Sequence, residues 1–353
     1  MGRSGAEAGV DAAIVGLLKQ RAGRWHSGQA LSSELGLSRT AVWKHIKGLR
    51  RAGYAIEASP SRGYRLDLSR LPFNAVEIGA GLATEFVGRS LHFHEELDST
   101  NRTAHELAAA GAPEGAAVVA ESQRAGRGRL GRRWHSPPGL NIHTSIVLRP
   151  AVEPHRAHGL TLMAAVALAE TIASTAGVRP ALKWPNDVLI EGRKTAGILL
   201  ELVSEADRVG FVVVGMGVNV NSTADDFPPE LRGRATSLRQ AAGTELSRTA
   251  LLQALYLNVE KWYKVLLHAG LGPVLDAWRG YFGHEGRTVR VRGLGGETVE
   301  GVCAGVDSDG ALLVRRPSGR VERVLAGDVE DFAEDAGRRH EEGPPAPWDR
   351  PCS

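Results

Sequence analysis

The sequence predicts an α+β protein built from several domains, and three observations lead to this fold class. The chain has 353 residues, which is enough for two or three domains. Apolar residues recur at helical spacing near its start, strand-like runs followed by separate helices fill its middle, and short alternating strands lie towards its end. With 42% apolar and 24% charged residues, most of the chain can bury a core.

The N-terminal segment reads as three helices followed by a β-hairpin. Val10 to Leu18 carry apolar residues at helical spacing, Ser27 can cap a second helix that ends at Gly36, and Ser38 can cap a third. Two strand-like runs then flank the turn at residues 59–63. A tight turn before a basic third helix, followed by a hairpin, is the plan of a winged helix-turn-helix.

The basic charge of the chain is concentrated in this segment. Residues 1–70 contain 12 Lys and Arg and 5 Asp and Glu, a net charge of +7, whereas the remainder carries −4. This asymmetry favours a polyanionic partner, and we expect DNA. The expected DNA contacts lie on the third helix and on the wing: Arg39, Thr40, Lys44, Lys47 and Arg62. The alternative is a small protein-interaction domain with a solvated basic face.

The central body is expected after a linker at residues 69–75. Its first half is predicted to contain a short helix over 76–84, a strand over 91–99, a helix capped by Ser99 or Thr100, and strands over 115–123 and 140–150. A long apolar helix over 156–177 follows, then strands around a Glu191–Gly192 turn and a further strand region over 209–221. Helices over 247–269 and 272–282 end the body. Strands with segregated helices predict a mixed or antiparallel sheet.

The stretch "QRAGRGRLGRRW", Gln123 to Trp134, packs five arginines around three glycines. Gly126 and Gly131 have the spacing of a P-loop, but Arg132 and Arg133 follow where a P-loop has Lys and Ser or Thr, and a strand follows where a P-loop has a helix. A disordered nucleic-acid-binding segment is disfavoured because the stretch is short and lies between two strands. An anion-binding loop is therefore favoured over an idle surface turn.

A second motif, "KWPNDV", places one cation and one carboxylate on a turn. The turn formed by Pro185 and Asn186 should hold Lys183 and Asp187 close together, an arrangement that suits phosphate chemistry. Exposed Lys–Asp pairs are common, so the motif alone is modest evidence. The run "GMGVNVN" lacks the third glycine of a dinucleotide fingerprint, so no Rossmann site is expected there.

Several classes of protein are disfavoured by what the sequence contains. Cys303 and Cys352 give neither a metal spacing nor a disulfide framework, and His155 with His158 reads as surface, so we expect no fixed metal site in the protein. No apolar run approaches 18 residues and the start lacks the apolar region of a signal peptide. We expect a soluble cytoplasmic protein without a membrane partner.

Four motifs in order carry a resemblance to a known family. They are "LDSTN", "AGRGRLGRRWHSPPGLN", "KWPNDVLIEGRKTAGILLEL" and "GMGVNVN". Together they resemble biotin protein ligases, and the predicted winged helix is similar to that of the bifunctional members, which are also the biotin operon repressor. The stretch "DSDGALLVRRPSGRVERVLAGDV" resembles their small C-terminal domain. The resemblance covers residues 10–333.

The resemblance implies three domains. It implies a winged helix-turn-helix over 10–68, a catalytic domain similar to class II aminoacyl-tRNA synthetases over 76–283, and an SH3-like β-barrel over 284–333. We expect residues 1–9 and the proline-rich tail 334–353 to be disordered.

The resemblance also implies a reaction in two steps. The carboxylate of biotin attacks the α-phosphate of ATP, which arrives with Mg²⁺, and gives biotinyl-5′-AMP and pyrophosphate. A lysine of a carboxylase's biotin carboxyl-carrier domain then attacks the mixed anhydride and releases AMP. The implied partners are this carrier domain, the biotin operator DNA, and a second copy of the chain when the adenylate is bound.

The same resemblance implies roles for particular residues. Lys183 would contact the biotin carboxylate and the α-phosphate, and Asp187 would orient or help deprotonate the incoming lysine. The residues that would line the biotin pocket are Ser99, Thr100, Asn101 and Gln123. Arg127, Gly128 and Arg129 would bind biotin and close over the adenylate, and Arg129 would also act in catalysis. Those that would lie near the nucleotide are Arg132, Trp134, Lys194 and Asn219.

Two features of the sequence depart from the family pattern, and two alternative functions stay open. Leu130 stands where repressor-type members can carry another arginine, and residues 222–238 contain no tryptophan for adenine stacking. Coupling of adenylate binding to dimerisation therefore stays open. A lipoate-attaching ligase is one alternative, and a transcription factor that senses biotin without ligase activity is the other.

Overall fold

The computed structural model describes residues 5–20, 23–205, 208–293 and 296–331. The chain divides into two compact units: residues 1–283 with 306–311, and residues 284–305 with 312–353. The tail 334–353, with Cys352, and residues 1–4, all part of segments expected to be disordered, lie outside the described residues.

The N-terminal module contains the predicted three helices and hairpin. Its elements are α1 (Gly5–Gln20), α2 (Gly28–Leu35), α3 (Arg39–Arg51), β1 (Ile56–Ser59) and β2 (Gly63–Leu66). Ser27 Oγ accepts from Ala30 N at 3.0 Å, and Ser38 Oγ accepts from Ala41 N at 3.1 Å, so both predicted N-caps are confirmed. One expectation is corrected: α1 begins at Gly5, so residues 5–9 of the segment 1–9 are helical, since the ends of helices are the part least specified by local sequence.

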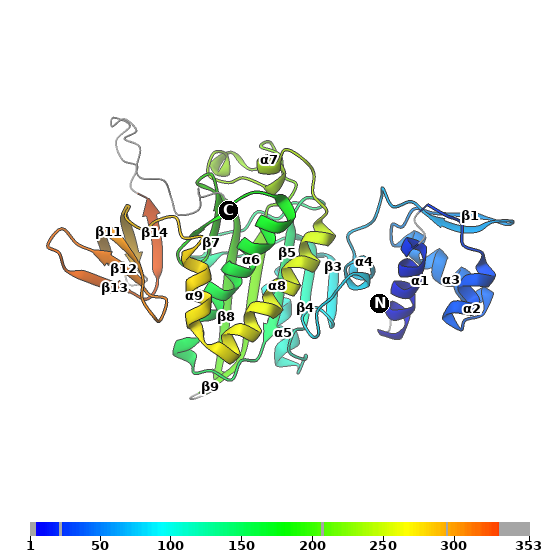
Figure 1. Cartoon of the computed structure of the whole chain (residues 1–353), viewed down its shortest axis with the longest axis horizontal. Helices are drawn as coiled ribbons and strands as arrows, with labels where there is room; N and C mark the ends of the chain where they lie inside the picture. Colours follow the sequence, from blue (N-terminus) through cyan, green and yellow to red (C-terminus); the bar gives the residue numbers. More distant parts are fainter. Residues whose placement is uncertain (1–4, 21–22, 206–207, 294–295, 332–353) are drawn as a thin grey trace, which may run out of the picture. The chain divides into compact units, whose positions relative to one another are not determined.

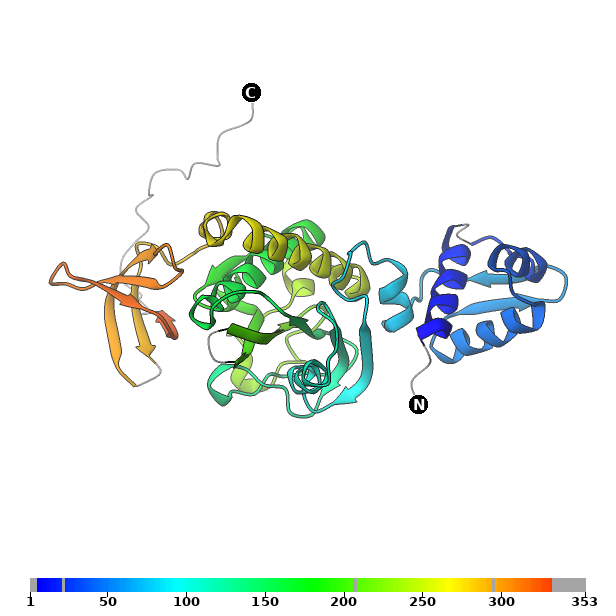
Figure 2. The same ribbon diagram turned by 90° about the horizontal axis from the view of Figure 1, so that it is seen from below.

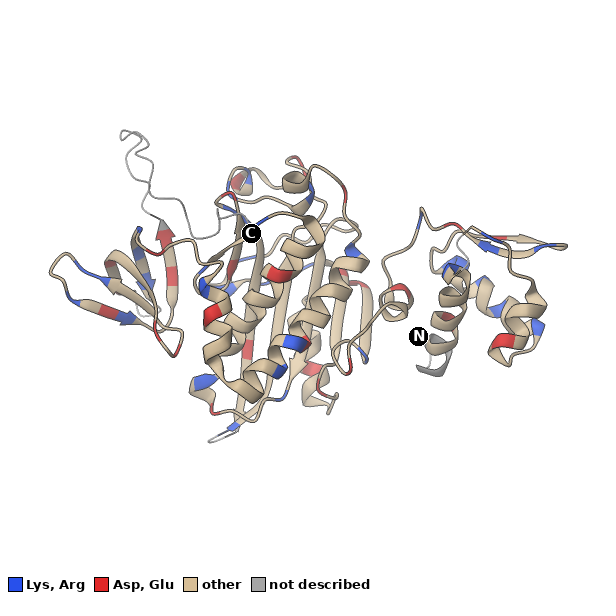
Figure 3. Ribbon diagram, in the orientation of Figure 1, with Lys and Arg blue, Asp and Glu red and all other residues tan. Residues whose placement is uncertain are grey.

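The third helix is amphipathic, as its sequence predicts. Val42, Ile46 and Leu49 are buried in a core cluster with residues of α1 and β2. The opposite side of α3 exposes the residues expected to meet DNA: Arg39, Thr40, Lys44 and Lys47. Figure 3 colours the Lys and Arg residues of this module blue.

A seven-stranded sheet forms the centre of the first unit. Its strands are β3 (Leu91–Leu97), β4 (Ala117–Gln123), β5 (Ile142–Leu148), β6 (Ala181–Lys183), β7 (Asp187–Ile190), β8 (Arg193–Glu205) and β9 (Arg208–Val218). The strand order is β3-β4-β5-β9-β8-β7-β6. Strand β3 pairs parallel to β4 and the other pairs are antiparallel, so the sheet is mixed. The predicted turn between β7 and β8 has positive φ at Glu191 (50°) and Gly192 (73°), as a tight hairpin requires.

The helices that follow the N-terminal module in this unit are α4 (Ala75–Ala80), α5 (Thr100–Ala109), α6 (Gly159–Ala176), α7 (Leu238–Ala242), α8 (Arg248–Ala269) and α9 (Leu271–Arg279). Short 3-10 turns cover Arg129–Gly131, Pro154–Arg156 and Pro229–Leu231. Helix α4 ends before the predicted residue 84, with Gly81 as its C-cap. Helix α7 was not predicted, because its five residues are too few to show a helical period.

The two faces of the sheet have different neighbours. Helices α6, α8 and α9 lie together along one face (Figures 1 and 2), where Thr144 Oγ1 of β5 lies 2.6 Å from Tyr256 Oη of α8. Successive side chains of a strand point to opposite faces. His143 and Ser145 therefore lie on the other face, which α5 covers at one end through Ala104 and Ala108.

One helical region, Pro154–Ala176, has the length and composition of a candidate membrane span, with mean hydropathy 1.4. Its most apolar window is 67% buried within the protein. It contains α6, which packs against the sheet and α8, so core packing accounts for its apolar composition.

The second unit is a small sheet. Its strands are β10 (Thr288–Gly293), β11 (Thr298–Val306), β12 (Leu312–Arg315), β13 (Val321–Val324) and β14 (Gly327–Asp331), in the order β13-β12-β11-β10-β14. Strand β10 pairs antiparallel with both β11 and β14, and β12 pairs antiparallel with β13. Among the residues described here, β13 and β14 do not pair with each other, so the sheet is open where a closed barrel was expected.

Candidate active site

The face of the central sheet opposite α6 and α8 carries polar side chains and glycines in three cross-strand rows. The first row contains Ser145, Gly215 and Leu199, and the middle row contains His143, Gly217, Gly197, Asp187 and Lys183. The third row, two residues further along the strands, contains Asn141, Asn219 and Thr195, and Asn219 N donates to Thr195 O at 2.8 Å. Rows two residues apart are separated by roughly 7 Å.

The first row adjoins most of the residues predicted to line a biotin pocket. Thr100 N donates to Gln123 Oε1 at 2.8 Å, and Ser145 Oγ lies 2.6 Å from Asn101 Oδ1. Ser99 is the N-cap residue of α5 and is buried, but its hydroxyl makes no capping bond. Helix α5, β4 and β5 thus bring together residues that lie far apart in the sequence.

A Cβ atom at Gly215 would lie 1.9 Å from Asn101 Oδ1. Glycine at this position is therefore what lets the Asn101 amide reach the sheet. The amide is held there by Leu199 O at 3.2 Å and Glu201 Oε2 at 2.9 Å, which accept from Nδ2.

The arginine-glycine loop folds back on itself as a small flap, which we call the lid (residues 124–134). Gly128 N donates to Arg132 O at 2.7 Å, and Trp134 N donates to Gly126 O at 2.9 Å. Its first residues are pinned to the loop after β3, because Arg124 Nε donates to Asp98 Oδ1 at 2.9 Å. The predicted setting between two strands is confirmed.

The lid arginines point in different directions. Arg129 Nη1 donates to Asn186 Oδ1 of the KWPND turn at 3.0 Å, and Arg127 Nη2 lies 3.9 Å from Glu201 Oε1. Arg132 is exposed. Leu130 adopts a left-handed conformation (φ 56°) and is 58% exposed, so nothing in the structure explains a leucine there.

Trp134 packs directly on the glycines of the middle row. A Cβ atom at Gly217 would lie 2.5 Å from Trp134 Cε2, and one at Gly197 would lie 3.2 Å from Cζ3. Lys194 Nζ lies 5.5 Å from the ring centroid. The two glycines therefore form a flat floor beneath an aromatic ring, and Trp134 Nε1 is buried without a hydrogen-bond partner in the described part of the chain.

Lys183 and Asp187 face each other across the turn between β6 and β7, as predicted. Asp187 is engaged further, since its Oδ1 lies 2.6 Å from Lys194 Nζ. Asn219, the third-row residue predicted near a nucleotide, donates through Nδ2 to Thr236 O at 3.1 Å.

His143 lies in the middle row at the end opposite Lys183. It is 1% exposed, and neither ring nitrogen has a hydrogen-bond partner among the described residues. Burial, with smaller effects of Arg248 and His135, lowers the pKa of His143 to about 3. The imidazole is therefore neutral at physiological pH.

We expect His143 to make the protein less stable in mild acid. The unfolded chain takes up a proton at this residue as the pH falls through about 6.5, whereas the folded chain does so only near 3. The contribution of His143 to the free energy of unfolding is thus fully present above pH 6.5 and declines as the pH falls below that value. Urea unfolding at pH 7 and at pH 5 measures the effect. Between these two pH values, the free energy of unfolding should fall by about 2 kcal/mol less in His143→Phe than in wild type. The exposed His155, changed to Gln, should behave as wild type.

Sequence reasoning missed Ser145, Glu201 and His143. The signal for two of them is the polar run His-Thr-Ser in β5, "IHTSIVL", whose first and third residues, His143 and Ser145, share one face of the strand. The position of Glu201 next to Asn101 depends on the pairing of β8 and the placement of α5, which local sequence does not specify.

The predicted DNA contact on the wing is held by an aromatic ring. Arg62 lies in the exposed turn between β1 and β2, and its guanidinium carbon is 4.3 Å from the centroid of Trp25. Arg65 stacks on the same ring at 5.0 Å. Trp25 thus positions two cations at the wing.

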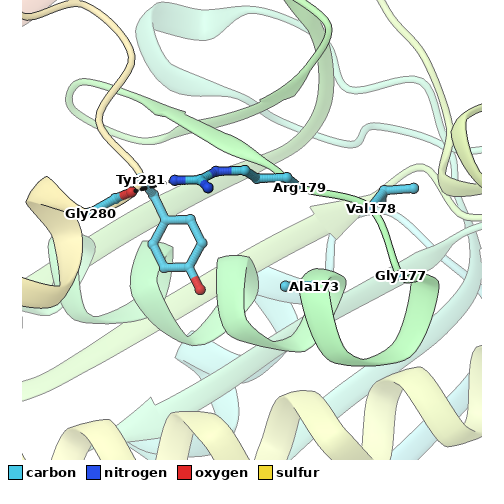
Figure 4. A pocket seen from close by; sticks show the side chains of 6 residues that line it. All are labelled: Ala173, Gly177, Val178, Arg179, Gly280 and Tyr281. Atoms are coloured by element: carbon cyan, nitrogen blue, oxygen red, sulfur yellow. Dashed lines mark hydrogen bonds between the residues drawn. The ribbon is translucent and has the colours of Figure 1, made fainter. Parts of the chain in front are cut away.

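A separate hollow of about 520 Å³ lies where the chain leaves α6 and α9 (Figure 4). Its lining is Ala173, Gly177, Val178, Arg179, Gly280 and Tyr281. It contains none of the residues of the three rows, so we place the site at the rows and the lid. Within the described residues, no group of three or more His, Cys, Asp or Glu side chains could hold a metal ion.

Three family models match the chain in sequence order: a helix-turn-helix domain at residues 12–65, the biotin/lipoate A/B protein ligase family at 93–219, and the biotin protein ligase C-terminal domain at 284–330. The bifunctional ligase/repressor BirA of Bacillus subtilis is 44% identical over 317 residues, which cover 90% of this chain and 97% of that protein. The chain belongs to the bifunctional biotin protein ligase family. Another member, the bifunctional ligase/repressor BirA of Escherichia coli, is 33% identical over 87% of this chain and 93% of its own.

A solved structure of a biotin protein ligase agrees with this assignment. The enzyme from Aquifex aeolicus in complex with biotin and ATP matches with a TM-score of 0.59 and 27% identity, over 68% of this chain and 97% of that one. The predicted resemblance, the ligase class and the N-terminal helix-turn-helix domain are confirmed by these family relationships.

Proposed function

We propose that this protein joins biotin and ATP to form biotinyl-5′-AMP, transfers biotin to a lysine of a carboxylase's biotin carboxyl-carrier domain, and represses biotin genes through its winged helix. The observation that carries the catalytic part is the order of the three rows. Residues suited to biotin, to phosphate and to a nucleotide follow one another along one face of the sheet.

The first row and α5 take the ureido ring of biotin in this proposal. Ser99, Thr100 and Asn101 present buried hydroxyl and amide groups, and Gln123 presents a half-buried amide. A ring with N–H and C=O groups needs such partners. The acyl chain then runs towards the middle row, where Lys183 meets the carboxylate. Asn219 and Lys194 lie at the nucleotide end.

The first chemical step brings an anionic carboxylate to an anionic phosphate. Cations and backbone N–H groups placed where negative charge develops offset the repulsion. Lys183 does so on the sheet, and the lid supplies Arg127, Arg129 and Arg132 together with the backbone at Gly128. The closed lid, which includes Trp134, keeps water from the anhydride.

Asp187 orients the acceptor lysine in the second step. Its carboxylate pairs with Lys194 at 2.6 Å, so the incoming ammonium has to replace that partner. Mg²⁺ would arrive with ATP, and its charge would neutralise part of the phosphate charge. Asp187 is the carboxylate of the middle row, and a magnesium ion is commonly held by one or two carboxylates together with substrate phosphates.

An assay with biotin, ATP and an acceptor domain tests the catalytic proposal. Biotin should give ATP-dependent pyrophosphate release and a biotinylated acceptor. Release with lipoate and none with biotin would favour the lipoate-attaching alternative. Biotin binding without pyrophosphate release would favour a sensor that lacks ligase activity.

The repressor part predicts salt-dependent binding to DNA upstream of biotin genes. Arg39→Ala and Lys44→Ala should each weaken binding, and removing one phosphate-binding cation should lower the slope of log affinity against log salt by about one. Ligase activity should be unchanged in both variants. Lys261→Ala is the control. It changes a lysine outside the N-terminal module, so this variant should bind DNA as wild type does. No binding by wild type at low salt would leave the module as a protein-interaction domain.

The remaining parts of the proposal concern architecture. We assign residues 10–68 to the winged helix, 69–75 to a linker, 76–283 to a catalytic domain similar to class II aminoacyl-tRNA synthetases, and 284–333 to an SH3-like C-terminal domain. We further propose a cytoplasmic protein that forms a homodimer when it holds the adenylate. Sedimentation with and without biotinyl-5′-AMP tests the dimer.

A further inference from the structure

Trp43 is an exposed aromatic residue on α3, the third helix of the N-terminal module. It is 51% exposed. Among the described residues of that module, 9–20 and 23–66, no other large apolar side chain is exposed to this extent. The apolar residues next to it on the helix, Val42, Ile46 and Leu49, are buried in the core cluster, and Trp43 is not part of that cluster. Packing of the module therefore does not account for a tryptophan at this position.

Cationic side chains flank the Trp43 ring on the same face of the helix. Arg39, Trp43 and Lys47 follow one another at intervals of four residues, so they lie along one face, and all three are exposed. Lys47 Nζ lies 5.2 Å from the centroid of the Trp43 ring, which is within the range of a cation–π contact. The face thus offers an apolar centre with a cation one turn away on either side.

The major groove of DNA has the complementary arrangement. Its edges carry phosphates, and its floor presents the 5-methyl group of each thymine, an apolar group that distinguishes this base. The net charge of +7 on residues 1–70 favours such a polyanion over an uncharged partner. Ser38 is the N-cap of α3, so Trp43 lies in the second turn, and the N-terminal residues of a recognition helix are those that reach base edges.

We infer that Trp43 is a specificity-determining residue, whose ring packs against the methyl group of a thymine in the major groove. Cations that bind phosphate position the helix and carry no sequence information, whereas this contact distinguishes thymine from the other bases. The inference rests on the proposed function, because it takes DNA as the partner of the winged helix. It adds the kind of base that the third helix reads.

The test removes single methyl groups from the DNA. Fluorescence anisotropy with the full chain, biotin and ATP measures binding to a duplex of the DNA upstream of biotin genes. In a series of further duplexes, deoxyuridine replaces one thymine at a time, which removes only the methyl group. Wild type should bind at least one of these duplexes about fourfold more weakly, because burying one methyl group contributes about as much as burying a CH₂ group.

Trp43→Ala should bind the unmodified duplex about tenfold more weakly than wild type. It should also lose the difference between thymine and deoxyuridine at the position where wild type shows one. Since no charge is removed, the slope of log affinity against log salt should stay that of wild type. Trp43→Phe keeps an aromatic ring and should retain part of the preference for thymine.

Lys44→Ala is the matched comparison on the same helix. It removes a cation, so the salt slope should fall by about one while the preference for thymine stays. Leu257→Ala changes an exposed apolar residue of α8, outside the N-terminal module, and should bind every duplex as wild type does.

The possible results separate this inference from the proposed function. If Trp43→Ala still distinguishes thymine from deoxyuridine, or wild type distinguishes them at no position, the role of Trp43 is overturned and DNA binding stands. Unchanged DNA affinity in Trp43→Ala also overturns that role and assigns the exposed ring to a protein partner. A wild-type protein that binds none of the duplexes at low salt overturns the DNA-binding part of the proposed function itself.

Discussion

Lys183→Ala is expected to lower the rate of biotinyl-5′-AMP formation by a factor of about 10² to 10³, the usual effect of removing one charge-stabilising group. Lys183 ends β6 in the middle row, opposite Asp187, where the carboxylate and the α-phosphate would meet. Without its ammonium group, the repulsion between the two anions is opposed only by the lid. Single-turnover pyrophosphate release measures this step apart from transfer.

The control for this variant is Lys261→Ala. Lys261 Nζ pairs with Glu170 at 2.9 Å on the helical side of the sheet, away from the rows. Its adenylation rate should be that of wild type. If Lys183→Ala also turns over near the wild-type rate, Lys183 has no part in the mechanism.

Gly215→Ala is expected to weaken biotin binding between about ten- and a hundredfold, which corresponds to the 1–3 kcal/mol that overpacking typically costs. The new Cβ would lie 1.9 Å from Asn101 Oδ1, so the amide has to leave its place between Ser145 and Glu201. Calorimetric titration with biotin measures the effect directly.

Gly272→Ala is the matched glycine replacement. It lies in α9, and a Cβ atom there meets nothing within 4 Å. This variant should bind biotin as wild type does. A Gly215→Ala protein with wild-type affinity would mean that the Asn101 amide is not required for binding.

Local sequence signals predict much of this fold. The caps at Ser27 and Ser38, the hairpin at Glu191 and the position of the lid between two strands all depend on neighbouring residues, and the structure has them where expected. Helix ends were less predictable: α1 begins earlier and α4 ends earlier than the sequence indicates, since terminal turns depend on packing beyond the helix.

The candidate site was predictable only in its motifs. The closeness of Lys183 and Asp187 follows from a short turn, whereas the three rows follow from strand register, which tertiary pairing sets. The pairing of Asp187 with Lys194 and the approach of Glu201 to Asn101 join separate segments, so no local pattern indicates them. The open edge between β13 and β14 shows that alternating strands do not by themselves specify closure of a barrel.

The backbone bonds within the lid have a consequence for its conformational entropy. Ordering a free loop costs about 1–2 kcal/mol for each residue, which would weaken any ligand that has to close it. Here the bonds from Gly128 to Arg132 and from Trp134 to Gly126 hold the loop as a preformed hairpin, with its first residue pinned at Asp98. Under the proposed function, the lid would close over the adenylate as a stiff flap that swings about its stem, and most of the free energy of the new contacts would be kept as affinity for that ligand.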